Sequence, residues 1–446
     1  MNKIIKLALR NLTRQKRRNA ILAIAIAFGF FVVTMIDGLT TGMVGNLEDM
    51  VTQVAGGTVL IGGYEKIPPE LEGQKGTVVN IVREKDYIKN LVEKNDIDYK
   101  YFSRFTKAAG QMIFNGRKSL TQVYGRDFSE KEFLNSFQIE AGSLENLSSP
   151  DAMIINSKVA DNLNLQIGDE IILTTRTVYG QNNVADFKIA LITKASNLVD
   201  STQVFVNIET LNEIVGIPEG GYSTFTIFLN DKTQQEKVAN KIEDLIRKDN
   251  ILVSDRRLAV MNNPSNPGKE INKQFISADQ QWEGVKYGVE CLEDAVPMIK
   301  TVLSVVHTIT TTILLVILLI VMVGVSNTYR MVLYERIREI GTMRALGMSG
   351  KDTGRLFTFE AVILCILGAL AGLLLAVILM TIIHLIPVGN ESLAFFLQKG
   401  HFSFSLSPVS IIVQYLLLII LTTFAVRGSA KKAAKMSPAE ALRTVK

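Results

Sequence analysis

The sequence predicts an integral membrane protein with four transmembrane α-helices, one before and three after a large extracytoplasmic α+β domain. Four apolar runs, at residues 20–44, 304–328, 358–386 and 402–426, each reach the roughly 20 residues that a helix needs to cross the bilayer hydrocarbon. Residues 45–303, between the first two runs, instead have the mixed composition of a water-soluble domain. The arrangement is therefore one span, the domain, and three further spans.

Basic residues that flank the apolar runs predict the orientation in the membrane. Residues 1–19 carry seven Lys or Arg and no acid, residues 329–355 carry six basic and three acidic side chains, and residues 427–446 carry six and one. Cytoplasmic segments of membrane proteins are enriched in Lys and Arg. We therefore expect both termini (1–19 and 427–446) and the connection 329–357 in the cytosol. The domain 45–303 and the short loop 387–401 are then expected on the extracytoplasmic side.

The N-terminal basic run leads straight into the first apolar run. A nucleic-acid patch or a cleaved signal peptide would also begin this way. The apolar run is longer than the core of a usual signal peptide and no small-residue cleavage site follows it. A retained signal-anchor helix is the better interpretation, and no nucleic-acid partner is expected.

The domain is expected to mix strands and helices. β-branched and alternating runs predict strands at 57–61, 153–155, 170–175, 187–192, 203–206 and 224–229. Helical spacing predicts helices at 86–95, 157–165, 208–215 and 232–248, with Asn156 or Ser157 and Asp231 as N-caps. Residues near 100–150 are a candidate inserted subdomain. The only histidines, His307, His384 and His401, lie in or beside the spans, so the loop offers neither a catalytic triad nor a histidine metal site.

Segments next to the spans raise two further expectations. Residues 45–55 and 271–300 can extend their spans outward as helices, the second because Val285, Val289 and Leu292 recur at helix-like intervals. Asp37 and Glu360 fall near the ends of spans, where snorkelling or helix capping is the expected role for a polar side chain.

The chain shows no energy-converting site. Gly350-Lys351 is the nearest approach to a phosphate loop, but Asp352 occupies the Ser/Thr position and Ala345 occupies that of the first glycine. We expect a non-catalytic subunit without metal or cofactor, with ATP and Mg²⁺ bound by a partner ATPase.

Three stretches carry a resemblance to a known family. Residues 334–348 (YERIREIGTMRALGM), followed by an apolar span with Gly368 and Gly372, are similar to the FtsX-type permease domain. The closing residues Ala433, Met436 and 437–443 (SPAEALR) resemble the end of the same superfamily, and residues 7–12 (LALRNL) resemble its cytosolic lead-in. The one-plus-three arrangement of spans is also typical of that superfamily, which includes MacB, LolC, LolE and FtsX.

This resemblance implies a mechanotransmission ABC transporter, in which separate ATPase subunits drive two permeases and work is done outside the membrane. The partners would be ABC ATPase subunits and a second copy of the permease or a paralogue. The segment after the second span would be the coupling helix. Its implied ATPase contacts are Glu335, Arg336, Glu339, Arg344, Ala345, Leu346 and Gly347.

Within the superfamily the LolC/LolE lipoprotein-release permeases are the best match. That resemblance implies a lipid-open cavity for a lipoprotein substrate among membrane lipids, bordered by Phe28, Phe31, Met35 and Val305. It also implies contact with a periplasmic carrier through the hairpin 176–186, at Arg176, Tyr179, Gln181 and Asn182, although a plain β-hairpin explains that segment equally well. MacB-like export with a separate ATPase and FtsX-like regulation of cell-wall hydrolases stay open as alternatives.

Overall fold

The structure is a computed structural model that describes residues 8, 10, 16–67, 78–194, 203–276, 282–388, 391–398 and 400–435. It divides into two compact units. We call Met1–Leu47 with Leu303–Lys446 the helical unit, and Glu48–Val302 the sheet unit. Most of the lead-in motif at 7–12 and the closing motif at 436–443 lie outside the described residues.

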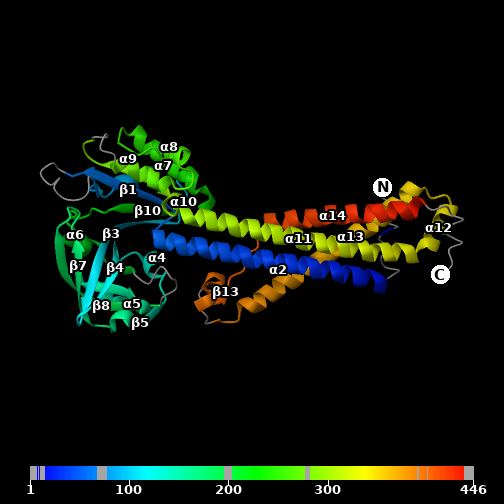
Figure 1. The fold of residues 1–446 in the computed structure, drawn as a ribbon, viewed down its shortest axis with the longest axis horizontal. Helices are drawn as coiled ribbons and strands as arrows, with labels where there is room; N and C mark the ends of the chain where they lie inside the picture. The colour runs from blue at the N-terminus through cyan, green and yellow to red at the C-terminus, as the bar shows by residue number, and fades with distance from the viewer. Residues whose placement is uncertain are drawn as a thin grey trace. The chain divides into compact units, whose positions relative to one another are not determined.

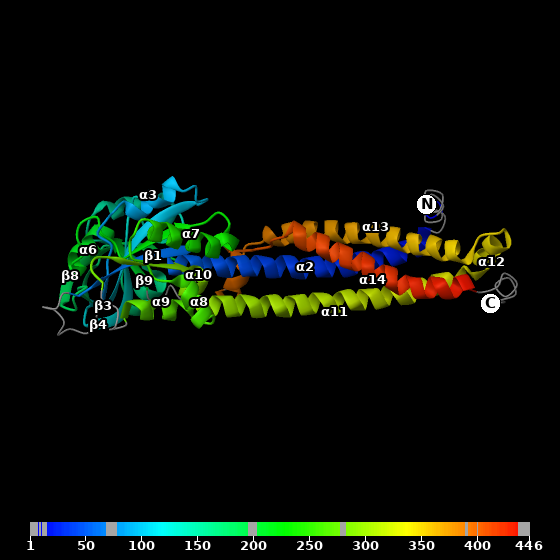
Figure 2. The same cartoon turned by 90° about the horizontal axis from the view of Figure 1, so that it is seen from above.

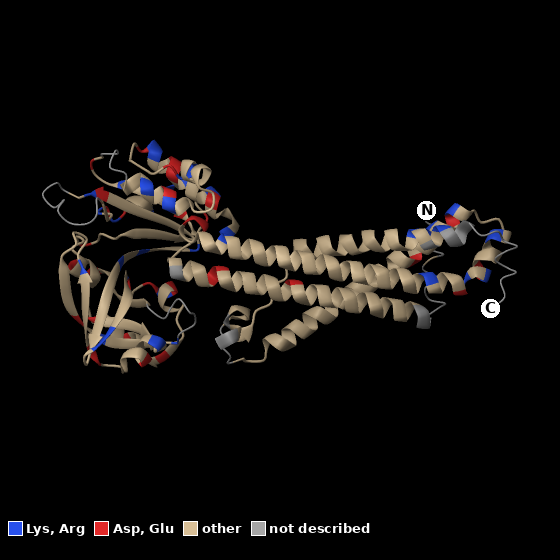
Figure 3. Cartoon of the chain, in the orientation of Figure 1, with Lys and Arg blue, Asp and Glu red and all other residues tan. Residues whose placement is uncertain are grey.

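Four long helices form the helical unit and run alongside one another (Figures 1 and 2). They are α2 (Lys16–Ala55), α11 (Pro297–Glu335), α13 (Gly350–His384) and α14 (Pro408–Lys435). Each contains a candidate membrane span, at Asn19–Gln53, Pro297–Glu335, Gly350–His384 and Pro408–Gly428. Few charged residues interrupt their lengths (Figure 3). The prediction of four apolar helices that are long enough to cross a membrane is confirmed.

Two glycines bring α13 against α2 at backbone distance. A Cβ atom placed on Gly372 would lie 2.3 Å from the carbonyl oxygen of Ala27, and one on Gly368 would lie 2.9 Å from that of Ala23. Small residues four apart allow membrane helices to approach this closely. The glycines in the apolar span thus have a packing role, and the helices around them enclose a buried core that includes Leu22, Ile26, Phe30, Phe357, Cys365, Leu418 and Val426.

Short elements complete the helical unit. Helix α12 (Ile337–Ala345) joins α11 to α13. Between α13 and α14 the chain forms η5 (Glu391–Phe396) and the two-stranded pair β12 (Leu397–Gln398) with β13 (His401–Phe402).

The sheet unit is built on one eleven-stranded mixed sheet, in the order β11-β1-β10-β3-β4-β9-β6-β8-β5, with β2 on β1 and β7 on β3 and β8. The strands are β1 (Val59–Lys66), β2 (Val78–Asn80), β3 (Tyr101–Phe114), β4 (Arg117–Arg126), β5 (Ile139–Gly142), β6 (Ala152–Asn156), β7 (Glu170–Arg176), β8 (Asn182–Thr193), β9 (Gln203–Asn207), β10 (Thr224–Phe228) and β11 (Lys286–Cys291). Most pairs are antiparallel, and β4–β9 and β6–β8 are parallel. The predicted strands at 153–155, 170–175, 187–192, 203–206 and 224–229 all lie in this sheet, which confirms the α+β class.

Helices cover the sheet and close its hydrophobic core. They are α3 (Tyr87–Lys94), α4 (Lys131–Leu134), η2 (Leu144–Ser148), α5 (Ser157–Leu163), α6 (Ile208–Val215), η4 (Lys232–Gln234), α7 (Gln235–Lys248), α8 (Arg256–Asn262), α9 (Pro267–Ile276) and α10 (Leu292–Ala295). Asn156 and Asp231 cap their helices as predicted, accepting from the backbone N–H of Val159 and Thr233. Residues 100–150, the candidate subdomain, contribute β3, β4 and β5 to the common sheet.

One of the two expected helical extensions is wrong. Helix α2 continues to Ala55, as predicted for 45–55. Residues 271–300 instead form α9, strand β11 and α10 before α11 begins at Pro297. Four of the six β11 residues, from Lys286 to Val289, are buried in succession. A strand buried on both faces carries apolar residues at any spacing, so the interval between Val285 and Val289 did not distinguish strand from helix.

Candidate functional site

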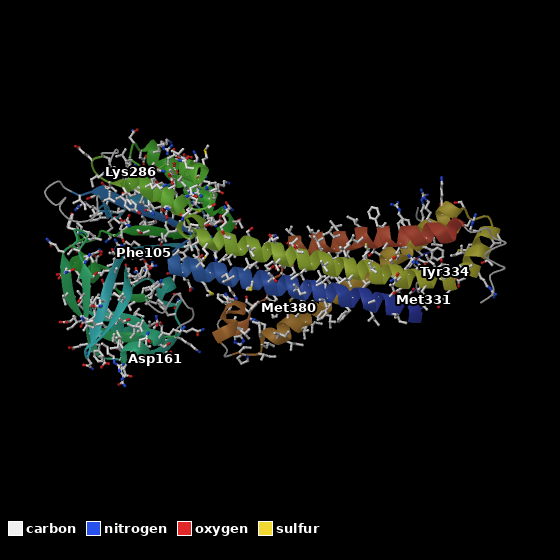
Figure 4. All side chains as sticks on the ribbon, viewed as in Figure 1. Phe105, Asp161, Lys286, Met331, Tyr334 and Met380 are labelled. Atoms are coloured by element: carbon white, nitrogen blue, oxygen red, sulfur yellow. The ribbon has the colours of Figure 1, made fainter. Side chains whose placement is uncertain are left out.

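The predicted coupling segment folds as a separate short helix between two long ones. Helix α11 ends at Glu335, Arg336 leaves the helical conformation, and α12 begins at Ile337. The buried side of α12 is formed by Ile337, Ile340 and Gly341. The segment lies at one end of the helical unit, where Met331 and Tyr334 are labelled in the last turns of α11 (Figure 4).

Arg336 anchors this segment to the first part of α13. Its Nη1 lies 2.7 Å from Oε2 of Glu360, its Nε lies 2.8 Å from Oε2 of Glu339, and its guanidinium lies 4.7 Å from the ring centroid of Phe357. Both Arg336 and Glu360 are buried. A buried arginine–carboxylate pair with further hydrogen bonds holds its elements in a defined geometry, and it is costly to break.

Tyr329 adds a second connection between the same helices. Its hydroxyl donates to the backbone carbonyl of Phe357 in α13, and its side chain is buried. The end of α11 and the start of α13 are therefore joined by a side-chain hydrogen bond and by the ion pair. The predicted roles of two residues change: Glu360 neither snorkels nor caps a helix, and Arg336 faces the interior and is not exposed for a partner.

A Schellman turn ends α12. The N–H of Met348 donates to Met343 (3.1 Å) and that of Gly347 donates to Arg344 (3.0 Å), while Gly347 has φ of +96°. This left-handed conformation is costly for residues other than glycine. Gly347 is therefore required by the turn itself.

The start of α13 does not resemble a phosphate-binding loop. Ser349 is its N-cap and accepts from the N–H of Asp352, while the Ser349 hydroxyl donates to the Asp352 carboxylate at 2.7 Å. A carboxylate thus occupies the helix N-terminus that a phosphate would need. These residues do not fit bound ATP.

One side of this segment is exposed on the helical unit. We call it the α12 face; it comprises Glu335, Arg338, Glu339, Thr342, Ala345, Leu346 and Gly347. Leu346 is 89% exposed although it is a large apolar residue. Arg344, also predicted to contact an ATPase, is half-buried.

Sequence reasoning missed Arg338 and Thr342. They are four residues apart and lie on one side of the helix together with Ala345 and Leu346. A helical projection started at Ile337 would have found them, but the start of α12 was not evident from the sequence.

The predicted lipid-contact residues lie on two helices that are far apart in sequence. Phe28, Phe31 and Met35 are on α2, and Val305 is on α11. Phe28 and Val305 are 64% and 51% exposed, and Phe31 and Met35 are partly buried. Phe28 and Phe31 lie on one side of α2 with ring centroids 6.2 Å apart. These exposures suit side chains that face membrane lipid.

The predicted carrier-contact hairpin is a compact turn between β7 and β8. In this turn the backbone N–H of Val178 donates to the carbonyl of Val215 at the end of α6. The side chains of Val178 and Tyr179 pack against a buried hydrophobic core. Arg176, Gln181 and Asn182 are exposed. The turn is thus fastened to the sheet unit by its apolar residues, while its polar residues face solvent.

A buried polar cluster lies where β11 meets α10 in the sheet unit. Nε of Arg256 lies 2.5 Å from Oδ2 of Asp294, and the same carboxylate accepts from the N–H of Cys291 at 3.0 Å. Burial, reinforced by the charge of Asp294, raises the pKa of Glu290 to about 7, although Arg256 opposes the shift. This carboxyl therefore titrates near neutrality.

The two parts of the chain match two family models. A model of the MacB-like periplasmic core domain matches residues 20–245, and a model of the FtsX-like permease C-terminal domain matches residues 311–438. The first match covers more than half of the 446 residues.

Two curated relatives illustrate the similarity. An uncharacterized ABC transporter permease of Methanocaldococcus jannaschii is 21% identical over 99% of this chain and 97% of its own length. The macrolide export ATP-binding/permease protein MacB of Agrobacterium fabrum is 32% identical over 120 residues, which are 27% of this chain and 17% of that protein. The second similarity thus spans about a sixth of the relative.

Solved structures give only a distant similarity. The extracellular domain of the noncanonic ABC-type transporter YknZ from Gram-positive bacteria aligns with 43% of this chain and 94% of its own, at 15% identity and a TM-score of 0.29. The periplasmic region of MacB from Actinobacillus actinomycetemcomitans aligns with 44% and 86%, at 9% identity and a TM-score of 0.29. At these TM-scores the alignments carry no structural argument.

Proposed function

The chain belongs to the ABC transporter permeases of the FtsX/MacB type, and from this premise we propose that it transmits the work of a separate ATPase to the sheet unit. ATP and Mg²⁺ would be bound by that ATPase, and a second permease copy or paralogue would complete the transporter. The chain is a multi-pass membrane protein with a periplasmic-type domain. We propose the inner membrane as its location, with both termini and α12 in the cytosol.

The observation that carries the proposal is the construction of α12. A cytosolic helix can pass a displacement to the spans only if it is rigidly joined to them. The Arg336–Glu360 pair and the Tyr329 hydrogen bond supply that connection to α11 and α13. The α12 face, with Leu346 exposed, supplies the contact surface.

For the substrate, we propose MacB-like transport of a molecule that is taken up on the outer side. The matched periplasmic core domain and the macrolide export relative favour this class. The substrate would then never need to cross the helical unit.

Lipoprotein release of the LolC/LolE type is a second proposal. The exposure of Phe28 and Val305 favours it, since acyl chains in a lipid-open cavity would contact such side chains. Each CH₂ of an anchor stabilises membrane insertion by about 0.8 kcal/mol, so extraction would need ATP. The compact β7–β8 turn gives carrier binding less support. FtsX-like regulation of a cell-wall hydrolase stays an alternative for which the geometry gives no specific observation.

Purification of the full chain from its native membrane in nanodiscs, followed by mass spectrometry of the bound proteins, tests the proposal. An ABC ATPase that co-purifies with wild type, and is lost from a Leu346→Asp variant, is the expected result. If no ATPase is retained by the wild-type chain, the proposal is wrong.

Depletion of the chain in cells distinguishes the substrate classes. Retention of lipoproteins in the inner membrane would support release. Unchanged lipoprotein sorting, together with loss of export of a small molecule or peptide, would support MacB-like transport. A defect limited to cell-wall hydrolysis would support regulation.

A further inference from the structure

We propose that Asp37, Ser410 and Gln414 form a binding site for a monovalent cation, a proton or Na⁺, inside the helical unit. Asp37 lies on α2, and Ser410 and Gln414 lie on α14. Asp37 and Ser410 are 373 positions apart in sequence. This proposal is independent of the proposed coupling to an ATPase.

The site is a chain of hydrogen bonds that ends on a carboxylate. The hydroxyl of Ser410 donates to Oδ2 of Asp37 at 2.8 Å, and Nε2 of Gln414 donates to the oxygen of Ser410 at 3.0 Å. Asp37 is only 7% exposed, within the candidate span Asn19–Gln53. The expected snorkelling of Asp37 to an interface is therefore wrong. In place of the other expected role, helix capping, its carboxylate accepts from a side chain in the first turn of α14.

One oxygen of this cluster lacks the hydrogen-bond partner that its burial calls for, and the buried carboxylate has no ion-pair partner among the described residues. Gln414 is 5% exposed, and its Oε1 is buried with no hydrogen-bond partner among the described residues. No Lys, Arg or His of the described chain forms an ion pair with Asp37. A buried carboxylate without a countercharge and an unpaired amide oxygen each cost free energy in a low-dielectric interior. A bound cation would remove both costs.

Among the described residues, the elements around Asp37 supply no side-chain cation that pairs with it, and the first turn of α14, which holds Ser410, offers only the partial positive charge of a helix N-terminus. A Cβ atom placed on Gly38 would lie 2.5 Å from Cε of Met380 in α13 and 3.1 Å from Cδ2 of Leu406, in the segment before α14. The carbonyl of Gly38 accepts from the N–H of Ser405 at 3.0 Å. The titratable side chains that are nearest in sequence to Met380 and Leu406 are His384 and His401. Their Nδ1 atoms lie 2.8 and 2.9 Å from the backbone carbonyls of Phe402 and His384. Further along α2 the next charged residues are acidic, at Glu48 and Asp49.

The chemistry of the ligands limits the class of cation. Carboxylate, hydroxyl and amide oxygens suit a hard cation. One carboxylate balances one positive charge, and no group of three or more acidic, Cys or His side chains is found among the described residues to hold a divalent metal. A proton would neutralise Asp37 directly, while Na⁺ would draw on Oδ1 or Oδ2 of Asp37, Oγ of Ser410 and Oε1 of Gln414.

The first measurement is ²²Na⁺ binding to the purified full chain in nanodiscs, at constant ionic strength. The second is infrared difference spectroscopy of the protonated carboxyl band over a pH series, with Asp37→Asn subtracted from wild type. Saturable ²²Na⁺ binding that Asp37→Asn abolishes would identify Na⁺. A carboxyl band that titrates with pH and is absent from Asp37→Asn would identify a proton.

Two further variants separate binding from structure. Gln414→Met removes the unpaired oxygen at similar volume and is expected to weaken Na⁺ binding, or to shift the titration equivalently, by roughly tenfold. Thr34→Val is the matched control, since Thr34 is buried on α2 one turn away and donates only to the carbonyl of Phe30 in its own helix; it should leave both signals unchanged. Absence of Na⁺ binding in wild type, together with no carboxyl signal that changes with pH, would overturn the proposal.

Discussion

Replacement of Leu346 by serine tests the α12 face at its most exposed apolar residue. Leu346 is the C-cap of α12 and is 89% exposed, so nearly all of its side chain is available to a partner. Complete burial of a leucine side chain stabilises a complex by about 1.5–3 kcal/mol. A loss of about 2 kcal/mol corresponds to roughly a 30-fold rise in Kd for the ATPase.

The same exposure makes this variant safe for the fold. Leu346 contributes little to the buried core, so Leu346→Ser should leave the melting temperature of the isolated permease within about 1–2 °C of wild type, as for other surface substitutions. Gly347 would be a poorer choice, because any side chain there must adopt φ of +96° and would disturb the turn.

The assay is equilibrium binding of the purified ATPase to the permease in nanodiscs, accompanied by a thermal melt of each variant. Leu385→Ser is a matched control. Leu385 is also a helix C-cap and is 71% exposed, but it lies at the C-terminal end of α13, whereas α12 precedes the N-terminal end of α13. Equal Kd values for wild type and Leu346→Ser would refute the assignment of the α12 face. A weakened Kd in Leu385→Ser would show that the effect is not specific to it.

Three other changes give predictions from the described contacts. Glu360→Gln removes the buried carboxylate that pairs with Arg336 and leaves it only the half-exposed Glu339. The variant should therefore lower the free energy of unfolding by about 3 kcal/mol, measured by denaturation in detergent, and an equally stable variant would contradict the anchor. Gly372→Leu should separate α2 from α13 and abolish stable insertion as judged by size-exclusion chromatography, whereas Gly324→Leu, where a Cβ meets no atom within 4 Å, should not. The pKa of Glu290 is raised on folding, so the folded sheet unit binds the proton more tightly than the unfolded chain; stability should fall as pH rises from about 4.5 to about 7, and Glu290→Gln should remove this slope from thermal melts.

Local patterns in the sequence predicted elements better than their connections. The strands at 153–155 and 170–175 and the helix at 208–215 agree with β6, β7 and α6, because alternation and helical periodicity are set by neighbouring residues. Strand β11 was missed because it is buried on both faces and does not alternate. The long strands β3 and β4 lie in residues 100–150, for which the sequence predicts only a candidate subdomain.

By itself the sequence determined the four apolar helices and the mixture of strands and helices in the domain, because hydropathy and periodicity act locally along the chain. Tertiary structure alone decided which polar residues meet. Arg336 reaches Glu360 over 24 positions, and Ser410 reaches Asp37 over 373. Each of these carboxylates has the same side chain whether it faces water or a neighbouring helix. Only the packing of the helices removes such a carboxylate from solvent and selects its partner. The sequence pattern therefore placed Asp37 and Glu360 at the ends of spans, whereas the fold buries both side chains.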